Sequence, residues 1–236
     1  MPGVAMRHRR RYTTPVPRAR AGGLGGGEVR VIAGSARGRR LKSGSAPRNR
    51  GAGLRPTADR VRESLFSILE AGRLGAGPLS GSAFLDLYAG TGSVGIEALS
   101  RGAARATFVE SDRACCRLIA ENLALTGLAA AAAVVCAPVA RALPTLERRG
   151  SRCGFIFIDP PYEGGLAADT LNMIGRTGLL VAGGVVVVEH SRRAALPEAA
   201  GGLSRIRRES YGDTVLSFYV SVGGTGMEGR HGEGDP

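Results

Sequence analysis

Four residues that follow one short apolar segment have the types and the order needed to methylate an amine. Asp159, Pro160, Pro161 and Tyr162 come directly after the segment FIFI. A nucleobase amine is a poor nucleophile because its lone pair is delocalised into the ring. The Asp159 carboxylate and the Pro160 carbonyl can accept its two N–H groups and turn the lone pair toward a methyl donor. Prolines fix φ and remove competing N–H donors, so these acceptors are rigidly aimed.

Tyr162 completes this corner, because its ring offers a flat face on which a base can stack. Ordering the reactants in this way can contribute roughly 7–11 kcal/mol of the barrier. Asp159 need not be a strong base, since the proton can leave after the nitrogen becomes cationic. The alternative is a plain turn that ends a strand, in which Asp-Pro is common. The complete tetrapeptide, downstream of a glycine loop, favours catalysis.

The glycine loop is the second motif. The segment DLYAGTGSVG contains a GxGxxG pattern whose first two glycines are Gly90 and Gly92. Glu110 follows at the end of the next apolar segment. Glycines let the backbone approach a ligand, and the acid can hold a ribose. The pattern alone would also fit a dinucleotide, or a tight strand-to-helix turn without a ligand.

Asp86 decides between the possible cofactors. It lies inside the strand before the glycine loop, where a carboxylate would repel a pyrophosphate and attract an ammonium or sulfonium group. A nicotinamide enzyme also has no use for Asp-Pro-Pro-Tyr at a later strand end. We therefore predict S-adenosyl-L-methionine as the cofactor, with Asp86, Tyr88, Gly90, Gly92 and Glu110 as binding residues.

Alternating strand and helix patterns predict the fold that must position these residues. We expect strands at AFLDLY, ATFVE, AAVVC, GFIFI and GGVVVVEH, and helices at 93–101, 112–126 and 138–149. Such alternation implies a parallel sheet with helices on both faces, and ligands bind at the carboxyl ends of its strands. A closing hairpin at Gly212-Asp213 is typical of the Rossmann-like class I methyltransferase fold, an α/β fold. We expect a mostly parallel seven-stranded sheet that ends in an antiparallel hairpin.

Charge divides the chain into two parts. The chain has 32 basic and 20 acidic residues, a net charge of +12. Residues 1–62 hold 16 of the basic residues and only two acidic ones, which gives this segment +14. The asymmetry points to a polyanion, most plausibly nucleic acid. The predicted domains are a disordered basic arm (1–27), a basic RNA-binding flap (28–56), a methyltransferase domain (57–222) and a disordered tail (223–236).

The flap is expected to be a short hairpin, VRVIAG with RGRRLK, that grips phosphates next to the active-site edge. Arginine suits phosphate because of its forked geometry, although such contacts carry no sequence information. The target base must leave any stack to reach Asp159, so we expect it to be flipped or unpaired. A helix follows at PTADRVRESLFSILEAG, where Arg62 fits ordinary pairing on the helix surface. The RNA-binding candidates are Arg37, Arg39, Arg40, Lys42 and Arg55.

Several protein classes are excluded by the composition. No apolar segment approaches the roughly 20 residues of a membrane helix, so we expect a cytoplasmic protein without a membrane partner. The four cysteines, Cys115, Cys116, Cys136 and Cys153, fit neither a zinc site nor a disulfide framework. We expect no metal, and a monomer.

Six segments together resemble one family, the RsmD-like 16S ribosomal RNA guanine-N2 methyltransferases. The resemblance runs from Val29 to Val220 and rests on RVIAGSARGRRL, LRPTADRVRESLFSIL, FLDLYAGTGSVGIEALSRGA, FVESD, IDPPY and YGDT. It implies methyl transfer from S-adenosylmethionine to one guanine amine of small-subunit rRNA, free or in a ribosomal subunit. It also implies that Thr57 and Arg60 lie on the methionine side of the cofactor.

One position departs from that family. Its members usually carry an acidic residue before alanine after the third strand, where it accepts the adenine amine of the cofactor. Here the pair is Cys136-Ala137, and a thiol is a weak acceptor. Either the backbone at Ala137 takes this role, or the correspondence is shifted.

Three other functions stay open on the sequence alone. A DNA adenine or cytosine amino-methyltransferase uses the same corner, although no room exists here for a target-recognition insertion. A protein glutamine methyltransferase presents similar geometry but would not need a basic arm. A non-catalytic RNA-binding assembly factor could keep the fold.

Overall fold

The computed structural model describes residues 29–43, 56–72, 74, 77–161 and 165–221, with the side chains of 56–58 excepted. The predicted basic arm and tail lie outside these residues. Tyr162 and Arg55 lie outside them as well, and of Thr57 only the backbone is described. What the sequence indicates about these parts stays a prediction.

An eight-stranded sheet forms the centre of the fold, in the order β5-β4-β3-β6-β7-β10-β9-β8. Its parallel strands are β3 (Ala83–Leu87), β4 (Arg105–Glu110), β5 (Ala132–Cys136), β6 (Cys153–Ile158) and β7 (Leu180–Ser191). The antiparallel strands are β8 (Ala199–Ala200), β9 (Leu203–Tyr211) and β10 (Thr214–Ser221). The mostly parallel sheet and its closing hairpin are confirmed, and the short edge strand β8 is additional to the seven predicted strands.

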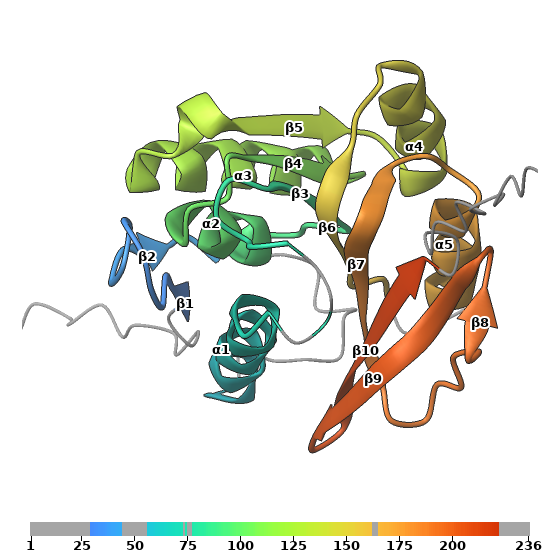
Figure 1. The fold of residues 1–236 in the computed structure, drawn as a ribbon. Coiled ribbons are helices and arrows are strands. Elements are labelled where there is room, and N and C mark those ends of the chain that lie inside the picture. Colours follow the sequence, from blue (N-terminus) through green and yellow to red (C-terminus); the bar gives the residue numbers. More distant parts are fainter. Residues whose placement is uncertain (1–28, 44–55, 73, 75–76, 162–164, 222–236) are drawn as a thin grey trace, which may run out of the picture.

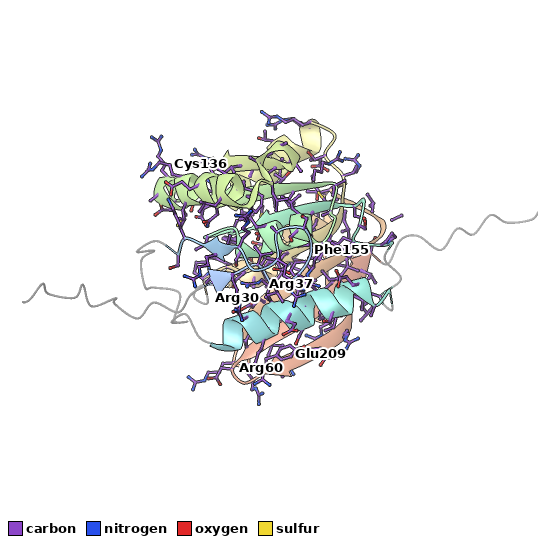
Figure 2. The ribbon with its side chains drawn as sticks, turned by 90° about the vertical axis from the view of Figure 1, so that its left-hand side faces the viewer. Arg30, Arg37, Arg60, Cys136, Phe155 and Glu209 are labelled. Atoms are coloured by element: carbon purple, nitrogen blue, oxygen red, sulfur yellow. The ribbon has the colours of Figure 1, made fainter. Side chains whose placement is uncertain are left out.

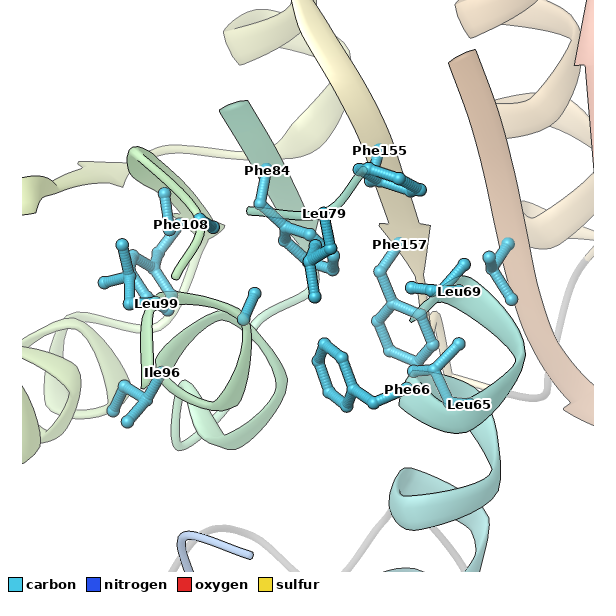
Figure 3. Close-up of a cluster of buried hydrophobic side chains, with 14 of the residues drawn as sticks. Leu65, Phe66, Leu69, Leu79, Phe84, Ile96, Leu99, Phe108, Phe155 and Phe157 are labelled. Carbon is cyan, nitrogen blue, oxygen red and sulfur yellow. The ribbon is translucent and has the colours of Figure 1, made fainter. Parts of the chain in front are cut away.

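Helices cover both faces of this sheet (Figure 1). Helices α1 (Pro56–Glu70), α2 (Ser93–Ser100) and α3 (Arg113–Thr126) pack on one face, and α4 (Val139–Arg148) and α5 (Leu166–Gly175) on the other. On the first face, the rings of Phe66 and Phe84 stack with centroids 6.3 Å apart, and Phe157 lies in the same cluster (Figure 3). Helix α5 was not predicted.

Helix α3 illustrates why these segments form where they do. The Asp112 side chain accepts from the backbone N–H groups of Ala114 and Cys115, which satisfies donors that the first helical turn leaves unpaired. The helix ends at Gly127, whose φ of 76° is the left-handed conformation that glycine adopts without strain. Both ends agree with the predicted boundaries. No helix in the described ranges is long and apolar enough to cross a membrane.

The predicted basic hairpin exists and packs over α2. Its strands β1 (Val29–Arg30) and β2 (Arg40–Leu41) pair antiparallel. At its turn, the Ser35 N–H donates to the backbone oxygen of Ser100 over 2.8 Å. At its end, the Lys42 N–H donates to Asn122 Oδ1 on α3 over 2.8 Å. The hairpin therefore lies across α2 rather than standing apart as a separate domain.

Glu97 on α2 joins three elements through its buried carboxylate, which is 0% exposed. It accepts from the backbone N–H groups of Ile32 and Ala33 over 2.7 and 3.0 Å, and from Arg101 Nε over 2.7 Å. Arg62 Nε on α1 lies 3.9 Å from the same carboxylate. Helix α1, helix α2 and the hairpin are thereby held together.

Arg62 is therefore a buried residue and not a surface one, contrary to the sequence interpretation. Only 6% of it is exposed. Its terminal nitrogen donates to the backbone oxygen of Arg30 over 2.6 Å and to Asp59 Oδ1 over 2.9 Å. Its Nε has no hydrogen-bond partner among the described residues. Helix periodicity could not show this burial, because the groups around Arg62 come from distant parts of the chain.

Candidate active site

The glycine loop turns the chain at the carboxyl end of β3. Tyr88 has a φ of 60°, which is unusual for a bulky residue, and Gly90 and Gly92 follow with φ values of 56° and 77°. The Tyr88 hydroxyl lies 2.8 Å from Thr170 Oγ1 on α5, which fixes this conformation. Strained backbone conformations of this kind cluster at ligand-binding sites. Cofactor binding by this loop stays a prediction.

Gly95, the third glycine of the pattern, sets how closely α2 approaches the sheet. A Cβ at this position would lie 2.3 Å from Cε1 of the buried Phe108 on β4. We expect Gly95→Ala to push α2 away, to cost about 1–3 kcal/mol of stability and to weaken S-adenosylmethionine binding. Thermal unfolding and cofactor titration would measure both effects. Gly77→Ala is the matched control, because a Cβ there meets nothing within 4 Å. Equal behaviour of the two variants would contradict the close-packing explanation.

Asp86 is 2% exposed and fixes the start of α2. Its Oδ2 accepts from the Gly95 N–H over 2.9 Å, while the residue at the N-cap of α2, Gly92, makes no side-chain cap. The carboxylate thus replaces the missing cap and lies at the positive end of the helix dipole. Direct contact between Asp86 and a cofactor stays a prediction.

Glu110 holds the other side of the glycine loop. It is 4% exposed. Its Oε2 accepts from the Gly90 N–H over 2.8 Å, and its Oε1 accepts from Ser111 and Asp112 N–H over 2.8 and 2.9 Å. The Ser111 hydroxyl also lies 3.4 Å from Oε1, so this carboxylate joins the glycine loop to the start of α3, and a bond to a ribose hydroxyl stays a prediction. The chemistry of Glu110 fits its predicted role.

The end of β5 supplies Cys136 and Ala137. Cys136 is exposed and pairs in register with Glu110, and the Ala137 N–H donates to the Glu110 backbone oxygen over 2.9 Å. Burial of the Cys116 thiol raises its pKa to about 12, and the nearby Cys136 thiol contributes to this shift. Cys116 is therefore a packing residue, and Cys136 and Ala137 are the residues placed beside the loop.

The Asp-Pro-Pro corner follows β6, next to the loop. Asp159 follows the last residue of β6, and its N–H donates to the Leu87 backbone oxygen over 3.4 Å, so Asp159 lies beside the end of β3. Pro160 is buried and Pro161 half-buried. Asp159, Pro160 and Pro161 thus follow β6 beside the end of the neighbouring strand β3, and their catalytic role stays a prediction.

Glu189 on β7 is the functional candidate that sequence reasoning missed. Ile158 pairs with Val188, so Asp159 and Glu189 come next on two neighbouring strands. Burial and the charge of Asp159 raise the pKa of Glu189 well above its ordinary value. A glutamate after a run of valines does not by itself indicate a raised pKa, because its charged neighbour Asp159 lies 30 positions earlier in the sequence and is brought close by strand pairing.

Four carboxylates therefore lie on one face of the sheet, at or near its carboxyl edge. Side chains alternate along a strand, and Phe84, Phe108, Phe157 and Val187 belong to one core cluster. The residues two positions further along share that face: Asp86, Glu110, Asp159 and Glu189. The described ranges contain no group of three or more His, Cys, Asp or Glu residues that could hold a metal ion.

Helix α1 carries Arg60 at its surface. Arg60 lines an open cleft of about 400 Å³ between α1 and β9, together with Arg207 and Tyr211. Figure 2 shows Arg60 and Cys136 toward opposite ends of the molecule. A position on the methionine side of the cofactor stays a prediction for Arg60, as it does for Thr57.

The basic hairpin lies only partly beside this site. Its turn packs on Ser100, the last residue of α2, whereas the active-site edge adjoins the first residue of that helix. Lys42 lies nearer, because Asn122 Nδ2 donates to both the Lys42 and the Thr91 backbone oxygens. The turn that carries Arg37 thus packs at the end of α2 opposite to the glycine loop, and a place for Arg37 beside the active site stays a prediction. The RNA-binding candidates of the hairpin are all exposed: Arg37, Arg39, Arg40 and Lys42, of which Lys42 is paired with Glu121 at 2.8 Å.

Known proteins resemble this chain over most of its length. The family described as conserved hypothetical protein 95 matches residues 29–220. Ribosomal RNA small subunit methyltransferase D of Escherichia coli K12 is 37% identical over 195 residues, which is 83% of this chain and 91% of the relative. The protein of the same name from Haemophilus influenzae is 34% identical and covers 69% and 79%.

A solved structure gives the same result for the fold. A hypothetical protein of Thermus thermophilus superimposes with a TM-score of 0.67 and is 34% identical. The match covers 82% of this chain and 99% of that structure.

Proposed function

Because this chain belongs to the conserved hypothetical protein 95 family, we propose that it is an S-adenosylmethionine-dependent methyltransferase of small-subunit ribosomal RNA. We further propose that the methyl group goes to the exocyclic amine of a guanine. On this basis the protein acts as a monomer in the cytoplasm, on 16S rRNA or on a small subunit during or after assembly.

The acidic face at the sheet edge is the observation that carries the choice of cofactor. Asp86 and Glu110 both bond backbone N–H groups of the glycine loop and its helix, in a protein whose net charge is +12. Carboxylates near a ligand attract positive charge and repel a pyrophosphate. This supports a cationic cofactor over a dinucleotide. When bound, S-adenosylmethionine supplies a methyl group on a positively charged sulfur.

The Asp-Pro-Pro corner supports an amine as the acceptor. The Asp159 carboxylate and the Pro160 carbonyl accept the two N–H groups and direct the nitrogen lone pair at the methyl group. The cofactor would supply the methyl group and keep the S–C bonding electrons, and the Asp159 carboxylate would be placed to take the proton that the methylated nitrogen gives up. Positioning supplies most of the effect, so Asp159 need not be a strong base.

Basic residues support RNA as the substrate class. We expect the combined change of Arg37, Arg39 and Arg40 to alanine to weaken RNA binding and to reduce its salt dependence, because each phosphate contact contributes a log–log slope of about 0.7–0.9. Filter binding at several salt concentrations would measure the slope. The matched control changes Arg141, Arg148 and Arg149, which are exposed on or beside α4 on the opposite face. A slope equal to that of wild type would remove the hairpin from the RNA interface.

One labelling experiment tests the proposed function against its alternatives. Tritiated S-adenosylmethionine is incubated with the protein and, separately, with naked 16S rRNA, small subunits, DNA and a release factor. We expect label in rRNA or in the small subunits. Label in DNA alone would indicate an amino-methyltransferase of DNA, and label in the release factor would indicate a glutamine methyltransferase. No label in any substrate would indicate a non-catalytic assembly factor.

A further inference from the structure

Glu189 lies next to Asp159 and has no role in the chemistry described so far. The pairing of Ile158 with Val188 brings the two carboxyl groups to the same place on neighbouring parallel strands, which lie about 4.8 Å apart. Both side chains point to the face that carries Phe157 and Val187. They are therefore neighbours at the sheet edge, although 30 positions separate them in the sequence.

Two neighbouring carboxyl groups do not ionise independently, because like charges in contact disfavour the charged form. Burial and the charge of Asp159 both raise the pKa of Glu189. Glu189 therefore keeps its proton to higher pH than an ordinary glutamate. A protonated carboxyl group has one O–H donor, whereas an ionised one can only accept.

Asp159 is a carboxylate whose orientation matters, since it must present an oxygen to the acceptor amine. The two residues that follow it, Pro160 and Pro161, have no N–H, so the next two backbone positions offer it no donor. The Asp159 N–H itself donates to Leu87. A hydrogen-bond donor on the neighbouring strand β7 would orient the Asp159 carboxylate while the Asp159 N–H keeps its bond to Leu87.

The other charged groups on this side are more remote in the sheet. Glu189 pairs with Leu216 on β10, and Leu216 pairs in turn with Glu209 on β9. Glu209 forms an ion pair with Arg207 at 2.9 Å. His190, the next residue on β7, is buried and lies 2.9 Å from Ser217 Oγ. Helix α1 contributes Arg60 and Glu63 to the cleft on β9. Asp159 is the charged neighbour of Glu189 within the strand pair.

We propose that neutral Glu189 donates a hydrogen bond to the Asp159 carboxylate and is thereby a positioning residue for methyl transfer. It keeps Asp159 ionised and aimed at the acceptor amine. No bond to Glu189 forms or breaks during the reaction, and its proton stays in place. The inference rests on the proposed function, because it concerns the same site.

The pH dependence of kcat with RNA tests the inference. Neutral Glu189 is the active form, so wild-type kcat should fall as pH rises through the raised pKa of Glu189, where the donor is lost and a second charge faces Asp159. Glu189→Gln keeps an N–H donor and cannot ionise, so it should retain most of the activity near neutral pH and lose this alkaline fall. Leucine in Glu189→Leu fills a similar space but has no hydrogen-bond donor. This variant should lower kcat about tenfold, with unchanged cofactor affinity.

Matched controls separate positioning from stability. Glu209→Gln changes the carboxylate further along the same row and should leave the pH profile unchanged. Urea unfolding of each variant shows whether it is folded at the assay temperature. If Glu189→Gln is as inactive as Glu189→Leu, or keeps the wild-type alkaline fall, the inference is wrong. If wild-type protein transfers no methyl group to a guanine amine, the proposed function fails instead.

Discussion

Replacing Asp159 with alanine should lower kcat for RNA methylation by at least about 100-fold, since misplacing a reacting group by 1 Å can cost that much. S-adenosylmethionine affinity should stay close to that of wild type. Asp159 lies at the end of β6, whereas the residues that hold the glycine loop, Asp86 and Glu110, belong to β3 and β4. Single-turnover transfer of tritium and calorimetric titration of the cofactor measure the two quantities separately.

Asp159→Asn is the matched control for this change. Asparagine keeps one acceptor oxygen in the same place but loses the charge, so it should retain part of the activity. Parallel loss of methyl transfer and cofactor affinity in Asp159→Ala would instead make Asp159 a structural residue of the cofactor site.

Replacing Glu97 with alanine should lower the free energy of unfolding by about 3–5 kcal/mol, the range found when one partner of a buried ion pair is removed. The Ile32 and Ala33 N–H groups and the Arg101 guanidinium would lose their acceptor. Arg62, whose Nε has no hydrogen bond to any described residue, would lose the buried carboxylate that lies 3.9 Å from this atom. Urea unfolding with a common m-value measures the change.

Two further variants test this explanation. Glu97→Gln keeps an acceptor oxygen and should fall between wild type and Glu97→Ala. Glu121→Ala removes an exposed ion pair with Lys42 and should change stability by less than about 1 kcal/mol. A loss in Glu97→Ala as small as that in Glu121→Ala would mean that the network does not hold the hairpin to the domain.

Most of the site could be predicted because its residues follow strands with strong patterns. The valine run of β7 and the apolar segment of β6 mark buried parallel strands, and parallel strands bring their carboxyl ends to one edge. Glu110 therefore lies against the glycine loop, and Asp159 follows the strand next to β3. The helix cap Asp112 and the closing Gly127 were equally local signals.

What could not be predicted depends on contacts between distant segments. Glu189 gains its partner from strand pairing, and Glu97 binds N–H groups that precede it by 64 and 65 residues. Arg62 is buried for the same reason. The packing of the turn on Ser100 could not be predicted, because a sequence shows that a hairpin is basic, but not which end of α2 receives its turn.

Helix α5 and strand β8 were missed for a different reason. Helix α5 starts after Gly165 without a side-chain cap, so its start carries no capping signal. Strand β8 has two residues and forms through its pairing with β9. A segment this short has no periodicity to recognise.

The most direct measurement is the chemical identity of the methylated nucleoside. Small-subunit rRNA, naked and in subunits, is incubated with the protein and S-adenosylmethionine, digested to nucleosides and resolved by mass spectrometry against standards. We predict one new product, N2-methylguanosine, absent when Asp159→Ala replaces the wild type. Methylation of adenosine, of cytidine or of a guanine ring nitrogen would contradict the claim that this corner presents a guanine amine to the methyl donor.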